Sequence, residues 1–198
     1  MILLLVIIGV LANILIGAAD VKLKKIKLAG GAKAIIAIGI VSLLALAGQP
    51  VVFTPFLLMG AMSPVTIPAT LAQQIAEALT GIALAQLIRP GTPVVFGSFL
   101  SNVDMQSGSP QFGTPESGIG LLCTGQIARS FNLPFRGGGT LNSSQSVDAQ
   151  AGYQTIMTML PTFLAGTNWV MHSAGWLEGG LVSSYDKFVV DIEILQSL

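Results

Sequence analysis

The stretch Pro90–Ser98, with the sequence PGTPVVFGS, sets the pattern from which the fold follows. An apolar run with helical spacing, residues 69–88, precedes it, and the Pro-Gly pair ends that helix. The apolar residues that come next predict a short strand at 94–98, followed by a long polar loop at 102–114. Short β-branched and aromatic runs of this kind are typical of strands that helices cover on both faces.

This alternation of strand and helix repeats along the chain. We expect strands at 50–54, 94–98, 133–139 and 168–173, and helices at 69–88, 115–131, 147–164 and from 184 onward. Four such units with short connections predict a parallel sheet and amount to half of a (β/α)8 barrel. We therefore predict an α/β fold: a partial TIM barrel of about four βα units, preceded by apolar N-terminal helices. An open doubly wound sheet is the alternative, but the Gly-rich stretch 136–139 precedes polar residues and not the helix of a nucleotide-binding turn.

Charged residues are scarce in this sequence. Nine basic residues balance nine acidic ones, and together they make up 9% of the chain, against about 25% in ordinary globular domains. The low charge excludes a disordered tail and a coiled coil. From residue 49 onward four basic residues stand against eight acidic ones, so we expect no nucleic-acid partner. One cysteine and one histidine cannot assemble a zinc site, and we expect no metal.

The amino-terminal part departs from the βα pattern. Residues 1–19 are apolar apart from Asn13, and at about 1.5 Å per residue they can cross a hydrocarbon core of about 30 Å. A basic stretch follows at 21–27, and a second apolar run covers 34–48. We therefore place a domain boundary after residue 48. Residues 1–48 are interpreted either as a membrane anchor, with membrane contact through residues 1–19, or as an atypical leader.

Six short motifs follow one another in residues 49–198. They are GAMSPVT at 60–66, AEAL at 76–79 with QLIRPGTPVV at 86–95, DMQSG at 104–108, QIAR at 126–129, DAQA at 148–151 and SYDKFVVD at 184–191. Together they resemble the trimethylamine methyltransferase family, and the resemblance runs through essentially all of 49–198. It implies that 49–198 is part of a TIM-barrel methyltransferase domain located in the cytoplasm. It also implies that the full-length protein, much longer in this family, forms homo-oligomers.

The resemblance further implies a corrinoid-dependent methyltransferase. In such an enzyme a methylated amine, trimethylamine or a betaine, gives a methyl group to the cobalt of a corrinoid (cobalamin) carried by a separate corrinoid protein, in one-carbon metabolism or methanogenesis-type pathways. The chain contains no pyrrolysine, on which the founding trimethylamine enzymes depend, and relatives without it are thought to use betaines or similar compounds. Two other function classes stay open: a non-catalytic membrane-associated fragment and a different TIM-barrel enzyme.

A quaternary ammonium group has no proton to donate, so aromatic faces and carboxylates are the groups that hold it. The aromatic candidates are Trp176, Tyr185, Phe53, Phe96 and Phe99. Among them we predict substrate contacts for Trp176, Tyr185 and Phe96, with core packing as the alternative for Trp176 and for each phenylalanine. If the substrate also carries a carboxylate, Arg136 or His172 is predicted to neutralise it, and an ordinary solvated or loop-bonding arginine is the alternative for Arg136.

Catalytic roles are predicted for His172, Glu178 and Asp104. His172 stands at the carboxyl end of the expected strand 168–173, where the active sites of TIM barrels lie. Glu178 and Asp104 are carboxylates on Gly-rich loops after strands, and capping of its own loop is the alternative for Asp104. On the last helix, Ser184 is expected to cap the amino terminus and Asp191 to face solvent. The sequence assigns no residue to cofactor binding.

Overall fold

A computed structural model describes residues 30–198 of the protein. The described residues divide into two units between Leu43 and Leu44, and the second unit is Leu44–Leu198. Helix α2, Gly30–Leu46, opens the described part, and its sequence is almost entirely apolar. The segment 1–19, for which we predict membrane contact, lies outside the described residues. The domain boundary after residue 48 stays a prediction.

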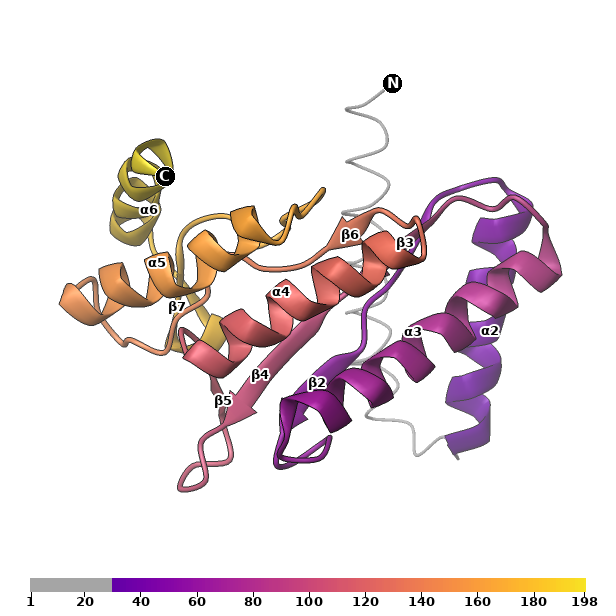
Figure 1. The fold of residues 1–198 in the computed structure, drawn as a ribbon, viewed down its shortest axis with the longest axis horizontal. Coiled ribbons are helices and arrows are strands. Elements are labelled where there is room, and N and C mark those ends of the chain that lie inside the picture. Colours follow the sequence, from indigo (N-terminus) through magenta and orange to yellow (C-terminus); the bar gives the residue numbers. More distant parts are fainter. Residues whose placement is uncertain (1–29) are drawn as a thin grey trace. The chain divides into compact units, whose positions relative to one another are not determined.

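A three-stranded parallel sheet organises the second unit (Figure 1). Its strands, in the order β1-β3-β6, are β1 (Val51–Phe53), β3 (Val94–Gly97) and β6 (Phe135–Arg136). Two isolated parallel bridges, Arg136 with Trp169 and Gly139 with His172, place the segment around 169–172 beside β6. The expected strand 168–173 is therefore reduced to two bridges, because Gly138 and Gly139 adopt positive φ and interrupt the ladder.

A second sheet continues the first beyond short breaks in two strands. Its strands, in the order β2-β4-β5, are β2 (Phe56–Met59), β4 (Phe99–Val103) and β5 (Pro110–Gln111). The pair β2 and β4 is parallel, and β4 turns back antiparallel into β5. The polar loop expected at 102–114 therefore contains the end of one strand and the whole of another.

The helices lie close to their predicted positions. They are α3 (Ile67–Ile88), α4 (Pro115–Ser130), α5 (Ala149–Leu164) and α6 (Tyr185–Ser197). Thr114, Asp148 and Ser184 each accept a hydrogen bond from a backbone N–H of the first turn of α4, α5 and α6, which confirms the predicted cap at Ser184. The prediction that Asp191 faces solvent is wrong, because its side chain is fully buried against α5. A small hairpin of β7 (Trp176–Leu177) and β8 (Val182–Ser183), with a 3₁₀ turn at Glu178–Gly180, precedes α6.

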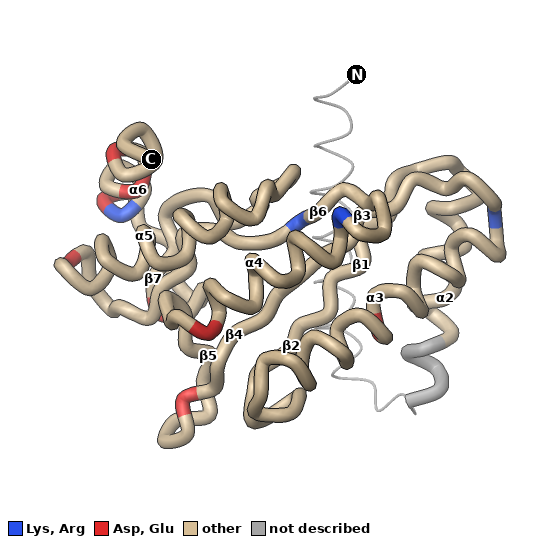
Figure 2. Tube along the Cα trace, viewed as in Figure 1, with Lys and Arg blue, Asp and Glu red and all other residues tan. Residues whose placement is uncertain are grey.

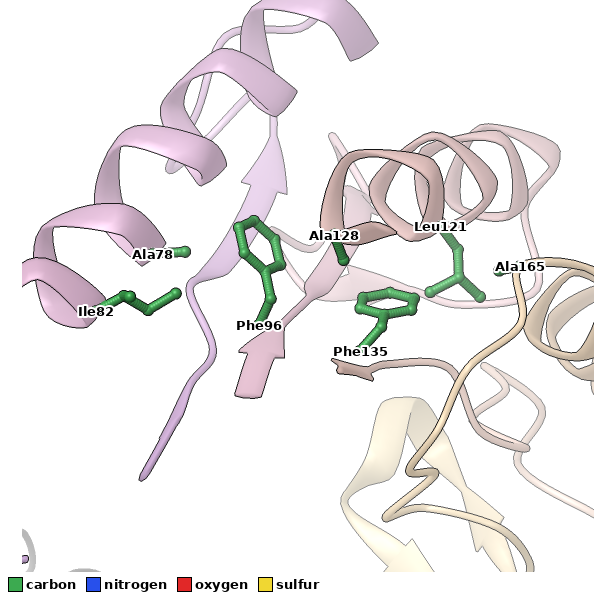
Figure 3. Close-up of a cluster of buried hydrophobic side chains, with 7 residues drawn as sticks. All are labelled: Ala78, Ile82, Phe96, Leu121, Ala128, Phe135 and Ala165. Carbon is green, nitrogen blue, oxygen red and sulfur yellow. The ribbon is translucent and has the colours of Figure 1, made fainter. Parts of the chain in front are cut away.

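The main hydrophobic core lies between the parallel sheet and the helices (Figure 3). Its buried members are Ala78, Ile82, Phe96, Leu121, Ala128, Phe135 and Ala165. Within the described residues, α3 is the one helix long and apolar enough to cross a membrane. It contributes Ala78 and Ile82 to this core and contacts three strands, as a core helix of an α/β protein does.

The described residues thus form a mixed α/β fold with parallel strands in chain order, which confirms the predicted fold class. Sequential parallel strands with helices packed one after another, α3 on α4 and α4 on α5, are also what a (β/α)8 barrel requires (Figure 1). The closure of these strands into part of a TIM barrel stays a prediction.

Candidate functional site

Polar and aromatic side chains meet where the strands of the first sheet end, which for β1 and β3 is the break before β2 and β4. Arg136 is the last residue of β6, Ser98 directly follows β3, and His172 lies at the bridge beside Gly139. The Arg136 guanidinium donates from Nη1 to the Ser98 carbonyl at 3.3 Å, and its Nη2 lies 3.3 Å from His172 Nδ1 and 3.6 Å from the sulfur of Met171. The carboxyl ends of parallel strands are where α/β proteins place their ligands.

Arg136 is a buried cation without an acidic partner. Its side chain is 6% exposed, and it is the one charged residue in the eight strands of residues 30–198. Figure 2 shows how sparse charge is along both sheets. Within the described part of the chain the ion pair present joins Lys187 to Asp191, and none reaches Arg136. Burial lowers the pKa of Arg136, but a guanidinium keeps its proton in proteins. A buried charge of this kind favours an anionic ligand.

His172 is neutral at physiological pH and is held by Arg136. Burial, and secondly the positive charge of Arg136, lower the pKa of His172 to about 4. A guanidinium only donates, so Nδ1 of His172 must accept and the ring proton must sit on Nε2. The imidazole therefore orients the guanidinium without adding a second charge.

A row of aromatic side chains lies beside His172 and is called the aromatic row. It consists of Phe56, Phe99, Phe112 and Trp176. Phe56 stacks on Phe99 with ring centroids 4.7 Å apart, and the edge of Phe112 meets Phe99 at 5.5 Å. Phe99 lies 5.9 Å from His172, and His172 lies 5.3 Å from Trp176, both in edge-to-face geometry. The row thus presents ring faces and edges from β2, β4 and β7 to one region, and ring faces attract cations.

A small cavity adjoins the row behind Phe99. It measures about 50 Å³ and is lined by Ser98, Phe99, Leu100, Phe112, Ser117, Gly118, Leu121, Gly138, Gly139, Leu141 and Thr158. Pockets that enclose a small molecule usually exceed about 300 Å³. The cavity is therefore too small to enclose such a molecule.

Three of the predicted site residues come together: Arg136, His172 and Trp176. Phe96 does not join them. It is fully buried in the core between the sheet and the helices, which corrects our expectation that it lines the substrate site (Figure 3). The physical reason is the alternation of side chains along a strand: Phe96 and Phe135 face the helices, so Arg136 faces the opposite side.

The other three predicted residues lie apart from the aromatic row. Tyr185 is the first residue of α6 and is 93% exposed. Asp104 accepts hydrogen bonds from the Gln106 N–H at 3.0 Å and the Ser107 hydroxyl at 2.7 Å, and these bonds lower its pKa. Glu178 is exposed in the 3₁₀ turn. No hydrogen bond joins any of the three to Arg136 or His172, so their roles at the site stay predictions.

Phe56, Phe99 and Phe112 complete the row; Phe99 was among the aromatic candidates without a predicted substrate contact, and Phe56 and Phe112 were not candidates. A signal was present: Phe53 and Phe56 are three residues apart, and so are Phe96 and Phe99. The register pairs Phe53 with Phe96 and Phe56 with Phe99, so the same spacing recurs across the break in both strands. The first phenylalanine of each pair packs toward the helices, and the second enters the row.

Parallel βα units, with an arginine and an aromatic row where the strands of the first sheet end, define an α/β protein with a candidate ligand site there. Residues 34–198 match the model of the trimethylamine methyltransferase family, and the chain belongs to that family. This confirms the resemblance that the six motifs indicated.

Three relatives show the range of the family. The chain is 45% identical over 148 residues to a glycine betaine methyltransferase of Desulfitobacterium hafniense, a match that covers 75% of this chain and 31% of the relative. It is 37% identical over 149 residues to a trimethylamine methyltransferase of Methanosarcina acetivorans, covering 75% and 30%. It is 33% identical over 147 residues to a proline betaine:corrinoid methyltransferase of Eubacterium limosum, covering 74% and 30%. The matched region thus spans about a third of the length of these relatives.

Proposed function

We propose that this chain forms part of a corrinoid-dependent methyltransferase that takes a methyl group from a betaine, a compound with both a quaternary ammonium and a carboxylate. The observation that carries the proposal is the buried, acid-free guanidinium of Arg136 beside the aromatic row. The names of the relatives, two of which include a betaine, support the same class. The βα units would then contribute to the TIM barrel of the complete enzyme.

The two kinds of side chain at the site correspond to the two ends of a betaine. Arg136 offers N–H donors to a carboxylate, and a charge-assisted bond of this kind offsets the cost of burying the guanidinium. Phe99 and Trp176 each pack edge-to-face with His172 and offer ring surfaces to a quaternary ammonium. Trimethylamine has no carboxylate, so it would leave Arg136 without an anionic partner. The site therefore favours a betaine over trimethylamine.

The residues of this chain bind and orient the substrate. A methylated quaternary nitrogen leaves as a neutral tertiary amine when it loses a methyl group, so no proton has to be delivered to it. His172 fits this requirement, because it is neutral and its Nδ1 is occupied by Arg136. The corrinoid, carried by a partner protein, supplies the nucleophile that accepts the methyl group. In the aromatic row Phe56 is exposed and Trp176 is half-buried, and such a partner would approach the row at Phe56.

Binding of small ligands to the 198-residue chain tests this proposal. Titration calorimetry should show glycine betaine binding more tightly than choline, which has the same ammonium group but a hydroxyl in place of the carboxylate. Arg136→Gln should weaken glycine betaine binding about 10- to 100-fold, as expected for the loss of a hydrogen bond between charged groups, and leave choline unchanged. The control is Tyr153→Phe, on an exposed ring of α5 outside the row. Equal binding of glycine betaine and choline to the wild type would contradict the proposal.

A further inference from the structure

A buried polar cluster joins α5 to α6 outside the aromatic row. It consists of Thr155 on α5 and of Lys187 and Asp191, one turn apart on α6, and all three side chains are fully buried. Lys187 Nζ forms an ion pair with Asp191 Oδ1 and donates to Thr155 Oγ1 at 2.8 Å. Thr155 Oγ1 in turn donates to Asp191 Oδ1 at 2.9 Å. Burial lowers the pKa of Lys187, and Asp191 opposes that shift.

The second carboxylate oxygen of Asp191 bonds outside the cluster, to the backbone next to Trp176. Oδ2 accepts a hydrogen bond at 2.8 Å from the backbone N–H of Gly175, which directly precedes Trp176. Gly175 has a φ of 90°, a conformation that favours glycine. On the other side, the carbonyl of Trp176 accepts a hydrogen bond at 2.7 Å from Nδ2 of Asn142, which is also fully buried. Buried polar side chains from two separate segments therefore hold the backbone on both sides of Trp176.

We propose that Asp191 and Asn142 are positioning residues that hold the ring of Trp176 against His172, with Lys187 and Thr155 fixing the carboxylate of Asp191. The effect on ligand binding rests on the proposed function, whereas the effect on Trp176 does not. Stability alone gives little reason for the ion pair, since buried pairs can often be replaced by apolar residues without loss. An apolar replacement could not accept the Gly175 N–H, and this bond is what the carboxylate adds.

Two matched double variants separate the hydrogen bond from the buried charge. Lys187→Met with Asp191→Asn removes both charges, but the new amide oxygen can still accept from Gly175 and its NH2 can donate to Thr155. Lys187→Met with Asp191→Leu also removes both charges and leaves the Gly175 N–H without an acceptor. Both are made together with Trp169→Phe, so that Trp176 is the one remaining tryptophan of the chain. Circular dichroism and thermal unfolding check that each variant folds.

Fluorescence of Trp176 gives the first readout, without any ligand. The Asp191→Asn variant should retain the emission and acrylamide quenching of the Trp169→Phe parent, whereas the Asp191→Leu variant should be quenched about twofold more strongly as the segment opens locally. Unchanged quenching in a folded Asp191→Leu variant would overturn the proposal. If that variant does not fold, Asn142→Leu in the same parent replaces it, because it removes the donor to the Trp176 carbonyl. Unchanged quenching there would overturn the proposal equally.

Affinity for glycine betaine gives the second readout. The Asp191→Leu variant should bind it about tenfold more weakly as one cation–π contact is lost, and the Asp191→Asn variant should bind it as the parent does. If the parent itself does not bind glycine betaine, the proposed function fails while the fluorescence still decides the positioning role. If the parent binds and both variants bind equally well, the positioning role fails and the proposed function stands.

Discussion

The cluster between the parallel sheet and helices α3 and α4, and the cluster between α5 and α6, bury side chains of opposite kinds. The first is entirely apolar, with Phe96 and Phe135 as its largest members. The second consists of Thr155, Lys187 and Asp191, with hydrogen bonds among all three. Apolar contacts have no direction, so the first cluster stabilises the sheet without fixing any one group. Hydrogen bonds are directional, so the second can hold a particular N–H, that of Gly175, in place.

The largest expected loss of stability comes from truncating a side chain of the apolar cluster. Phe96→Ala should lower the free energy of unfolding by about 4 kcal/mol, because it removes a fully buried ring and leaves a cavity between β3 and the helices. Urea unfolding followed by circular dichroism measures this loss. Val65→Ala, at an exposed position, is the control and should change the value by less than about 0.5 kcal/mol. A loss below about 1 kcal/mol for Phe96→Ala would mean that the ring is not part of the core.

A variant of the polar cluster should lose somewhat less of the free energy of unfolding, and a second substitution should restore it. Lys187→Met should lower the free energy of unfolding by about 3 kcal/mol, because it leaves the carboxylate of Asp191 buried without its cation. Adding Asp191→Asn should restore the value to within about 1 kcal/mol of the wild type, since no buried charge remains and the amide oxygen still accepts the Gly175 N–H. The same urea unfolding measures both variants. A double variant as unstable as the single one would show that the pair stabilises the fold as a unit, which would remove the contrast with the apolar cluster.

The smallest effect is a pH dependence from His172. Its pKa falls from 6.5 to about 4 on folding, so the unfolded chain takes up a proton at a pH where the folded protein does not. The neutral His172 contributes fully to the free energy of unfolding above pH 6.5. This contribution is lost as the pH falls from 6.5 to 4, and it does not change further below pH 4. His172→Asn keeps an acceptor for Arg136 but does not titrate. Between pH 7 and pH 4.5 the wild type should lose about 1 kcal/mol more than the variant, a value reduced for partial exposure. Equal losses would mean that His172 titrates normally.

The order of strands and helices could be predicted from local patterns. Apolar periodicity places α3, α4 and α5 within a few residues of their observed bounds, and cap residues such as Ser184 mark helix starts. The breaks that divide each long strand in two were not predicted, because the apolar pattern runs on through Ser98 and gives no sign that the second half pairs in another sheet.

Part of the candidate site was also predictable. Arg136 ends β6, His172 lies at the bridge beside it, and Trp176 comes shortly after the expected strand 168–173; position near the end of an expected strand is visible in a sequence. Asp191 was misplaced, because an acidic residue on an exposed-looking helix face is normally solvated, and its buried partner Thr155 lies 36 positions away. Phe96 was misplaced because strand alternation requires knowing which face of the sheet the helices cover.

The sequence by itself determined the α/β class, the approximate helices and strands, and membership of the trimethylamine methyltransferase family, because each depends on local periodicity or on ordered motifs. Only the tertiary structure decided which phenylalanines enter the core and which the aromatic row, that Arg136 is buried without an acid, and that Asp191 reaches Gly175. These facts depend on contacts between residues far apart in the chain, whose distances and directions no local pattern specifies.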